Sequence, residues 1–133
     1  MRGVVKSERG TSSIEFLLIA PFLLFILFAS VELSRAWFTM NLMTTAAREA
    51  VRAGVVAAPT NVTAAGNARL TQILAASPST AGWTGGVTCS ANPCAPDAVV
   101  TATVSLNFTT VVPNLLPMLN PIVLQQTASM RYE

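Results

Sequence analysis

The stretch Arg9-Gly10-Thr11-Ser12-Ser13-Ile14-Glu15-Phe16 leads directly into an apolar run, FLLIAPFLLFILFASV, which occupies residues 16–31 and decides the fold. Its sixteen residues without a charge fall short of the roughly 20 that a helix needs to cross a hydrocarbon core. The segment from Thr11 to Val31 has 21 residues, and at about 1.5 Å per residue it reaches the required length of roughly 30 Å. We therefore predict a membrane-spanning helix over about 11–31 that includes Glu15.

Glu15 places a carboxylate at the head of this predicted span. A buried ionisable group in a membrane is costly, commonly faces protein or water, and indicates a functional site. The alternative is that Glu15 marks the membrane interface, with a shorter helix that tilts or thins the bilayer around it. The apolar run alone leaves both interpretations open.

The composition is that of a small membrane-associated chain. Its 133 residues allow one anchor and one small domain, and the mean hydropathy is +0.55 with 11% charged residues. The formal net charge of +2 is carried by residues 1–10, in which Arg2, Lys6 and Arg9 outnumber Glu8. The remaining chain holds five basic and five acidic residues, so we expect no nucleic-acid surface. Cations that precede the apolar run place the N-terminus in the cytoplasm and the rest of the chain outside.

A cleaved secretory signal peptide would also begin with a basic segment and an apolar stretch. The apolar stretch here is longer than the usual 7–15 residues, and no clean small-x-small cleavage site follows it. The tripeptide Phe28-Ala29-Ser30 has a bulky residue where a small one is needed. The sequence therefore favours a membrane anchor.

The helical pattern continues beyond the apolar run, because small and apolar residues recur at steps of four and three. We predict one long helix from about Ser12 to Ala57, within the segment 11–58. Its N-cap is expected among residues 11–13, and Pro21 is expected to kink or loosen it. The repeat, called the small-residue stripe below, consists of Ala36, Met40, Met43, Ala47, Ala50, Gly54 and Ala57.

The small-residue stripe has two interpretations. An amphipathic helix usually covers its own core, which predicts packing against the domain that follows. Small residues also let another backbone approach closely, which predicts lateral packing against other subunits. One helix can do both along its length, so both interpretations stay open.

Residues 59–133 are predicted to form a small extracytoplasmic α+β domain. A weaker helical pattern covers 62–76, and Ser77-Pro78 ends it before a glycine-rich loop that runs to Gly86. Three prolines and two asparagines indicate an irregular excursion over 111–121.

Alternation of period two predicts half-buried strands over 98–109 and in the last twelve residues, and a third strand is expected around 86–90. These strands would form a small antiparallel sheet that packs on the outer half of the long helix. The residues assigned to the buried faces are Ala98, Val100, Ala102, Val104, Leu106 and Phe108 in the first strand and Ile122, Leu124, Ala128, Met130 and Tyr132 in the last.

Cys89 and Cys94 are the only cysteines, and the chain has no histidine. A structural zinc site needs four such ligands, so a metal site fails on ligand count unless subunits share it. Outside the cytoplasm a disulfide is expected, and a loop this short would fix local shape more than global stability. Two free buried thiols remain the alternative, because the sequence does not give the Cα separation.

Catalytic chemistry has almost no candidates. Without histidine there is no ordinary Ser-His or Cys-His nucleophile, and Asp97 and Glu133 are the only carboxylates of the outer domain. Glu49 is predicted to form a solvated ion pair on the long helix. Trp83, in the glycine-rich loop, is either a packing residue or an exposed contact. We expect no enzyme, no cofactor and no metal.

The combined motifs resemble those of TadE-like minor pilins of the tight adherence pilus system. The resemblance rests on Arg9-Gly10 with small residues after it, Glu15-Phe16, the apolar helix with Pro21, and Ala46-Ala47-Arg48-Glu49-Ala50-Val51-Arg52. The ending Met130-Arg131-Tyr132-Glu133 is similar as well. The resemblance is specific over roughly the first 57 residues, and it implies a type IV pilin-like fold.

The resemblance also implies processing and a site of assembly. A prepilin peptidase would cut after Gly10 on the cytoplasmic side, so that Thr11 becomes the mature N-terminus and Glu15 its fifth residue. The partners implied are other minor pilins, the major pilin, the prepilin peptidase and the assembly platform of the bacterial inner membrane. We hypothesise that Glu15 pairs with the N-terminal amine of a neighbouring subunit, since neither charge is easily buried alone.

A function of another class uses the same anchor. The chain would then be a single-pass, membrane-anchored extracytoplasmic binding protein with no pilus role. That function predicts an uncut leader and indifference to substitution of Glu15.

Overall fold

The structure is a computed structural model that describes residues 9–111 and 121–133, with side chains described from Ser13 onward. Most of the predicted leader, 1–10, and most of the predicted excursion, 111–121, therefore lie outside the described residues.

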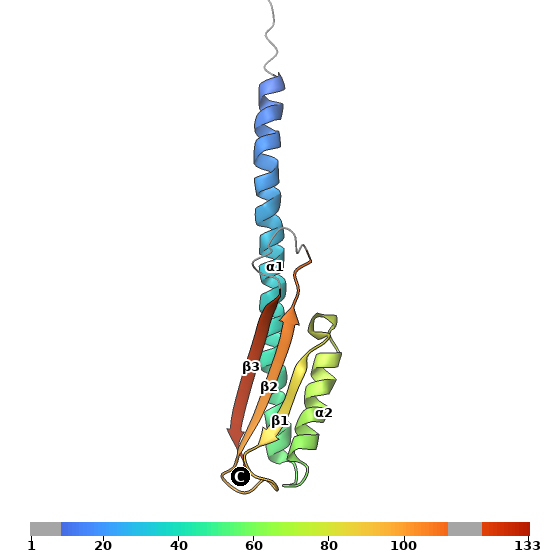
Figure 1. The fold of residues 1–133 in the computed structure, drawn as a ribbon, viewed down its shortest axis with the longest axis vertical. Helices are drawn as coiled ribbons and strands as arrows, with labels where there is room; N and C mark the ends of the chain where they lie inside the picture. The colour runs from blue at the N-terminus through green and yellow to red at the C-terminus, as the bar shows by residue number, and fades with distance from the viewer. Residues whose placement is uncertain (1–8, 112–120) are drawn as a thin grey trace, which may run out of the picture. The chain divides into compact units, whose positions relative to one another are not determined.

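Two α-helices, a short 3-10 helix and three strands make up the described chain (Figure 1). This confirms the predicted α+β fold, with a long N-terminal helix and a small antiparallel sheet. In chain order the elements are α1 (Arg9–Val56), α2 (Val62–Ala75), η1 (Pro78–Thr80), β1 (Thr84–Cys89), β2 (Val99–Phe108) and β3 (Ile122–Arg131).

Helix α1 begins earlier than its capping residues suggest. Residues 11–13 lie inside the helix, which already includes Arg9, so the predicted N-cap is wrong. Serine and threonine cost well under about 1 kcal/mol each inside a helix, so they permit a start without forcing one. The helix continues through Pro21 and ends at Val56, where the N–H of Ala57 donates to the carbonyl of Gly54 at 3.1 Å.

The chain divides into two units, residues 1–34 and 35–133, and the boundary falls inside α1. In the first unit, the side chains from Ser13 to Val31 are all exposed except those of Ala20 and Ala29, which are half-buried. An 18-residue window of the helix has a mean hydropathy of 2.5 and is not buried at all. By length and composition this helix could cross a membrane.

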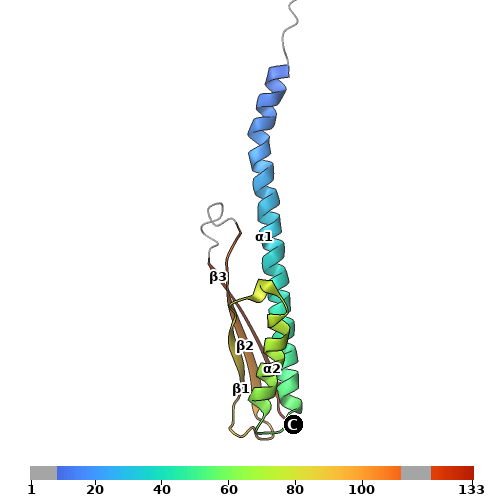
Figure 2. The ribbon, with the colours of Figure 1, turned by 90° about the vertical axis from the view of Figure 1, so that its right-hand side faces the viewer.

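The second unit contains the sheet, in the order β1-β2-β3, with both neighbouring pairs antiparallel. In the register of the sheet, Ala102 of β2 lies opposite Val87 of β1 and Ala128 of β3. Figures 1 and 2 together show α2 and the 35–56 part of α1 on the same face of this sheet. The other face of the sheet is open to solvent among the described residues.

Alternation along β2 explains why the helices lie on one face. Val100, Ala102 and Val104 are fully buried, whereas Thr101 and Thr103 between them are half-buried. All six residues predicted for the inner face of this strand are buried. The core consists of Met43, Ala46, Ala47, Ala50, Val51, Val62, Leu70, Leu74, Val87, Cys94, Ala98, Val100, Ala102, Val104, Leu106, Phe108, Leu124 and Tyr132.

Strand β1 begins two residues before the predicted third strand, so that Gly85 belongs to the sheet rather than to a loop. Gly85 has a φ of 130°, and a Cβ built there would overlap the backbone carbonyl of Thr103. Only glycine allows the strand to pass this close to β2. A sequence pattern assigns such glycines to loops because their close neighbour is distant in the chain.

The last strand differs from prediction on one point. Leu124 and Tyr132 are buried as expected, but Met130 is 47% exposed. Period two gives the face of a residue correctly, yet the helices do not cover every position of an edge strand. Tyr132 also donates from its hydroxyl to the carbonyl of Ala57 at 2.8 Å, which ties the residue after β3 to the end of α1.

Substitution of Gly85 tests the close approach of β1 to β2. Gly85→Ala should lower the free energy of unfolding by about 3 kcal/mol, because it adds backbone strain and a clash with a backbone oxygen. Gly82→Ala is the matched control, since Gly82 has a φ of 79° but no atom within 4 Å of the added Cβ. It should cost about 1 kcal/mol. Denaturant unfolding of the full chain in detergent, followed by circular dichroism, measures both; equal losses would contradict the assignment.

Candidate functional site

The first unit presents Glu15 and Phe16 on the part of α1, residues 13–31, in which most side chains are exposed. Phe16 is 70% exposed, and Glu15 is the only charged residue between Ser13 and Val31. Gly10 and Thr11 lie in α1, although the side chain of Thr11 is not described. Thr11 and Glu15 are four residues apart in a helix, so both are on the same helical face.

The small-residue stripe packs into the chain's own core, which contains residues of α2 and of the sheet. Met43, Ala47 and Ala50 are fully buried in the core, and the half-buried Ala36 and Met40 pack against it. A Cβ at Gly54, the next residue of the stripe, would lie 3.2 Å from the carbonyl oxygen of Val62 and 3.3 Å from a methyl of Val100. The stripe is therefore occupied within one subunit.

Exposed apolar side chains continue beyond the predicted end of the span at Val31. Leu33, Trp37 and Phe38 are 71%, 66% and 60% exposed. The predicted span ended at Val31 because Glu32, the next residue, is charged. The side chain of Glu32 is nevertheless buried, with 8% of its surface exposed, so it does not interrupt the exposed apolar surface. Aromatic residues that follow an apolar run are typical of a membrane interface, and Trp37 and Phe38 provide this signal in the sequence.

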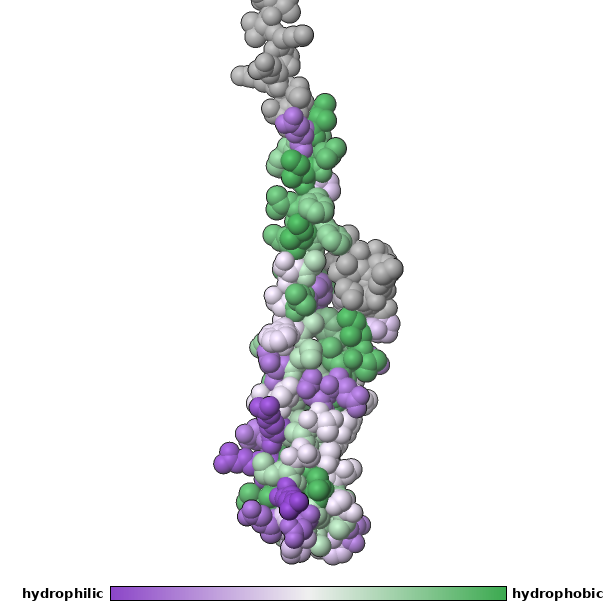
Figure 3. All heavy atoms as spheres, turned by 90° about the vertical axis from the view of Figure 1, so that its left-hand side faces the viewer, coloured by the Kyte–Doolittle hydropathy of each residue, from purple (hydrophilic) through white to green (hydrophobic). Residues whose placement is uncertain are grey.

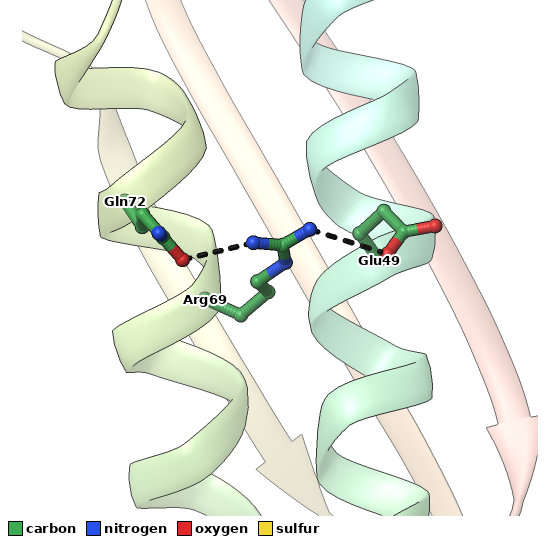
Figure 4. Close-up of polar contacts among 3 residues, drawn as sticks. All are labelled: Glu49, Arg69 and Gln72. Carbon is green, nitrogen blue, oxygen red and sulfur yellow. Dashed lines mark hydrogen bonds and ion pairs between the residues drawn. The ribbon is translucent and has the colours of Figure 1, made fainter.

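Glu49 forms a solvent-exposed ion pair, but its partner is on α2 and not on the long helix, where the pair was predicted. Its carboxylate lies 3.7 Å from Nη2 of Arg69 on α2, and Nη1 of Arg69 donates to Oε1 of Gln72 at 2.9 Å (Figure 4). The two side chains of the ion pair are 42% and 40% exposed, so water screens the attraction and its contribution stays below about 1 kcal/mol. Arg48 and Arg52 are exposed on α1.

The Cys89–Cys94 disulfide is confirmed, with a Cα separation of 5.9 Å. Cys94 is 4% exposed, and its N–H donates to the carbonyl of Pro59 at 3.2 Å. The bridge thereby holds the loop after β1 against the connection between α1 and α2. Among the residues that the structure describes, no three His, Cys, Asp or Glu side chains are grouped to hold a metal ion.

Trp83 and Asp97 are the remaining residues that the sequence singled out. Trp83 is half-buried and packs against the core. Asp97 is exposed, with a φ of 67°, and its carboxylate lies 3.6 Å from Arg131. Neither arrangement forms a cleft with converging polar groups.

These features define a class of protein in which an exposed apolar helix, long enough to cross a membrane, belongs to a chain with a small α+β domain. A family model described as "TadE-like protein" matches residues 10–52, so the chain is TadE-like over this segment and the resemblance inferred from its motifs is confirmed there. The matched segment contains Gly10, Glu15, Arg48 and Arg52, and it ends before α2. No curated protein and no solved structure shows significant similarity to the chain.

Substitution in the small-residue stripe distinguishes packing within the subunit from packing between subunits. Ala47→Leu should lower the free energy of unfolding of the domain by about 1–3 kcal/mol, because Ala47 is fully buried and its site is filled. Thr45→Leu, on the exposed side of the same helix, should change it by less than about 0.5 kcal/mol. Thermal unfolding of both full-length variants in detergent provides the measurement. An Ala47→Leu variant as stable as the parent chain would show that the stripe is not packed as described.

Proposed function

We propose that the chain is a minor pilin or pseudopilin that takes part in assembly of the tight adherence pilus. The observation that carries the proposal is the exposed apolar helix from Ser13 to Val31, with one carboxylate near its start, inside the segment that matches the TadE-like family. A side-chain surface this apolar requires either lipid or other apolar helices around it. A pilin uses both in turn, first in the membrane and then in the assembly.

Cleavage after Gly10 would create a positively charged amine that can pair with the carboxylate of Glu15. Cleavage after Gly10 makes the nitrogen of Thr11 a free amine, one helical turn before Glu15. In a neighbouring subunit shifted along the helix axis, the same amine can approach this carboxylate. Each charge alone is expensive to remove from water, whereas the hydrogen-bonded pair is much less so. Glu15 would thus select the register between neighbouring helices.

The exposed part of α1 is the surface proposed to pack in the assembly. The small-residue stripe from Ala36 to Gly54 packs in or against the chain's own core, to which both α2 and the sheet contribute. Contacts with other helices are therefore assigned to the first unit, where Phe16 and the residues around Pro21 are exposed. Pro21 lacks a backbone donor, and in a membrane neighbouring helices or water can compensate for the freed carbonyl.

The proposed location is the bacterial inner membrane, with a single pass, the N-terminus in the cytoplasm and the domain in the periplasm or outside the cell. The basic residues of the leader support this orientation. A disulfide in the domain is consistent with an oxidising compartment. The partners proposed are the prepilin peptidase, the assembly platform, the major pilin and other minor pilins.

Substitution of Glu15 tests the assembly role. Glu15→Ala should reduce incorporation into the pilus assembly at least about tenfold, because the amine of a neighbouring subunit would be buried without its counter-charge. Glu49→Ala is the matched control, since it removes another α1 carboxylate whose ion pair is solvent-exposed. Quantitative immunoblotting of sheared pili and of membranes compares the variants. Normal incorporation of Glu15→Ala would contradict the assembly role of this residue and favour a membrane-anchored binding protein without a pilus role.

The mature N-terminus tests processing directly. In cells with an active prepilin peptidase, intact-mass spectrometry of the membrane form should show loss of residues 1–10 and a chain that begins at Thr11. The same chain from cells without the peptidase is the control and should keep the leader. A leader that is retained in both strains would contradict cleavage after Gly10.

A further inference from the structure

A small cavity lies at the end of the domain where β1 stops short of β2. Strand β1 begins at Thr84, opposite Ser105, whereas β2 continues to Phe108 alongside β3. Figures 1 and 2 show η1, the short helix after α2, at this same end of the sheet. The cavity has a volume of about 200 Å³. Its polar lining includes Arg35, Ser79, Asn107 and Thr109.

The main chain of β2 offers a hydrogen-bond donor on the side that β1 leaves open. The N–H of Ser90 donates to the carbonyl of Val99 at 2.9 Å, so the backbone groups of Val99 point toward β1. Every second residue of an antiparallel strand points the same way, which gives Asn107 this direction as well. Strand β1 does not extend this far, and no described residue accepts a hydrogen bond from the N–H of Asn107. By contrast, the N–H of Val87 on β1 donates to the side-chain carbonyl of Asn67 at 2.7 Å.

Arg35 supplies the positive charge of the cavity. Its guanidinium lies 5.3 Å from the ring centroid of Phe108, and a guanidinium stacked on a ring keeps its edge available for hydrogen bonds. Arg35 has a further interaction within the chain, and its five N–H donors allow it to bind an additional acceptor. The described residues that line the cavity include no carboxylate that would compete for these donors.

The chemistry of the lining suits an oxyanion. Hydroxyl groups of Ser79 and Thr109 add two donors to the guanidinium and to the main-chain N–H of Asn107. Arginine binds phosphate through two parallel N–H bonds, and hydroxyl and main-chain N–H groups bind the remaining oxygens. Pockets that enclose a drug-sized ligand measure roughly 300–1,000 Å³, so this smaller cavity fits one terminal group of a molecule whose remainder lies outside.

The position of Arg35 in the chain indicates a source of such a group. Arg35 follows Val31, the last residue of the apolar run, by four residues, and four residues of helix rise about 6 Å. The headgroup layer of a bilayer extends roughly 5–8 Å beyond the hydrocarbon on each side. Figure 3 shows apolar side chains over most of the visible side of α1 in the first unit. With this apolar run in hydrocarbon, Arg35 reaches the depth of the phosphate groups.

We propose that this cavity, called the Arg35 cavity below, binds the phosphate group of a phosphate ester. The ester is either a membrane phospholipid or a soluble compound, and the position of Arg35 favours the phospholipid. Arg35 would bind two of the phosphate oxygens, while the N–H of Asn107 and the hydroxyls of Ser79 and Thr109 would donate to the others. The proposal requires a membrane anchor but no pilus role, so it is separate from the proposed function.

Native mass spectrometry of the full-length chain tests the Arg35 cavity. The chain is released from mixed micelles that contain phosphatidylglycerol and a diacylglycerol with the same acyl chains. The parent chain should retain phosphatidylglycerol at least about tenfold more than diacylglycerol, because only phosphatidylglycerol has a phosphate group. Arg35→Gln should lower this retention at least about tenfold. Arg48→Gln is the matched control, since Arg48 is an exposed arginine of the same helix that does not line the cavity, and it should retain the lipid normally.

Thr109→Val is a second variant that leaves the ring of Phe108 and its guanidinium in place. Thr109 is exposed, and valine has nearly the same shape, so thermal unfolding should be unchanged. Loss of the hydroxyl should lower retention of phosphatidylglycerol about threefold to tenfold. This variant decides the matter if Arg35→Gln disturbs the fold.

Addition of sn-glycerol 3-phosphate distinguishes the two sources of phosphate. If it displaces phosphatidylglycerol, the cavity binds soluble esters as well; if it does not, the cavity is a lipid site, and both results support a phosphate site. Equal retention of phosphatidylglycerol and diacylglycerol would overturn the proposal. Normal lipid retention by a folded Arg35→Gln variant, or binding of neither phosphate compound by the parent chain, would overturn it too.

Discussion

The domain depends on how closely α1 can approach the sheet. At Ala47, Ala50 and Gly54 the helix carries little or no side chain, and the inward residues of β2 occupy the space that larger side chains would need. Gly54 leaves 3.3 Å between a notional Cβ and a methyl of Val100, so even one added carbon is tight. Close packing of this kind gives more dispersion contact per residue than a loosely fitted helix would. The outer part of α1 is thus a component of the core rather than a spacer.

Helix α1 therefore has different surroundings in its two halves. Residues 13–31 have exposed apolar side chains and no core of their own, whereas the residues from Met43 to Val51 are buried by the sheet on one face. Between them, Trp37 and Phe38 are exposed and aromatic. A soluble domain would not retain such a surface without a partner or a lipid phase. This division assigns contacts within the subunit and contacts with its surroundings to different parts of α1.

Sequence patterns within a single helix or strand predicted correctly which residues are buried, because these patterns depend on local geometry. Period two placed all six inner residues of the central strand correctly, and the spacing of small residues gave the buried side of α1. Such patterns do not predict contacts between different helices and strands. Asn67 looks like an ordinary polar helix residue until β1 lies beside it, and Glu49 has two arginines nearby in sequence but pairs with Arg69 on α2. Gly85 resembles a loop residue for the same reason, since only the position of Thr103 explains it.

The hydrogen bond from Tyr132 to Ala57 has a consequence for the order of folding. It joins residues 75 apart, and the last strand must be in place before the end of α1 gains this bond. During synthesis the helix can form early, whereas the sheet that covers it requires the later strands. Until then the alanine-rich side of α1 lacks part of the core that covers it, and lipid, another helix or a chaperone can contact it. A nascent subunit therefore passes through a stage at which its own core residues are available to other proteins.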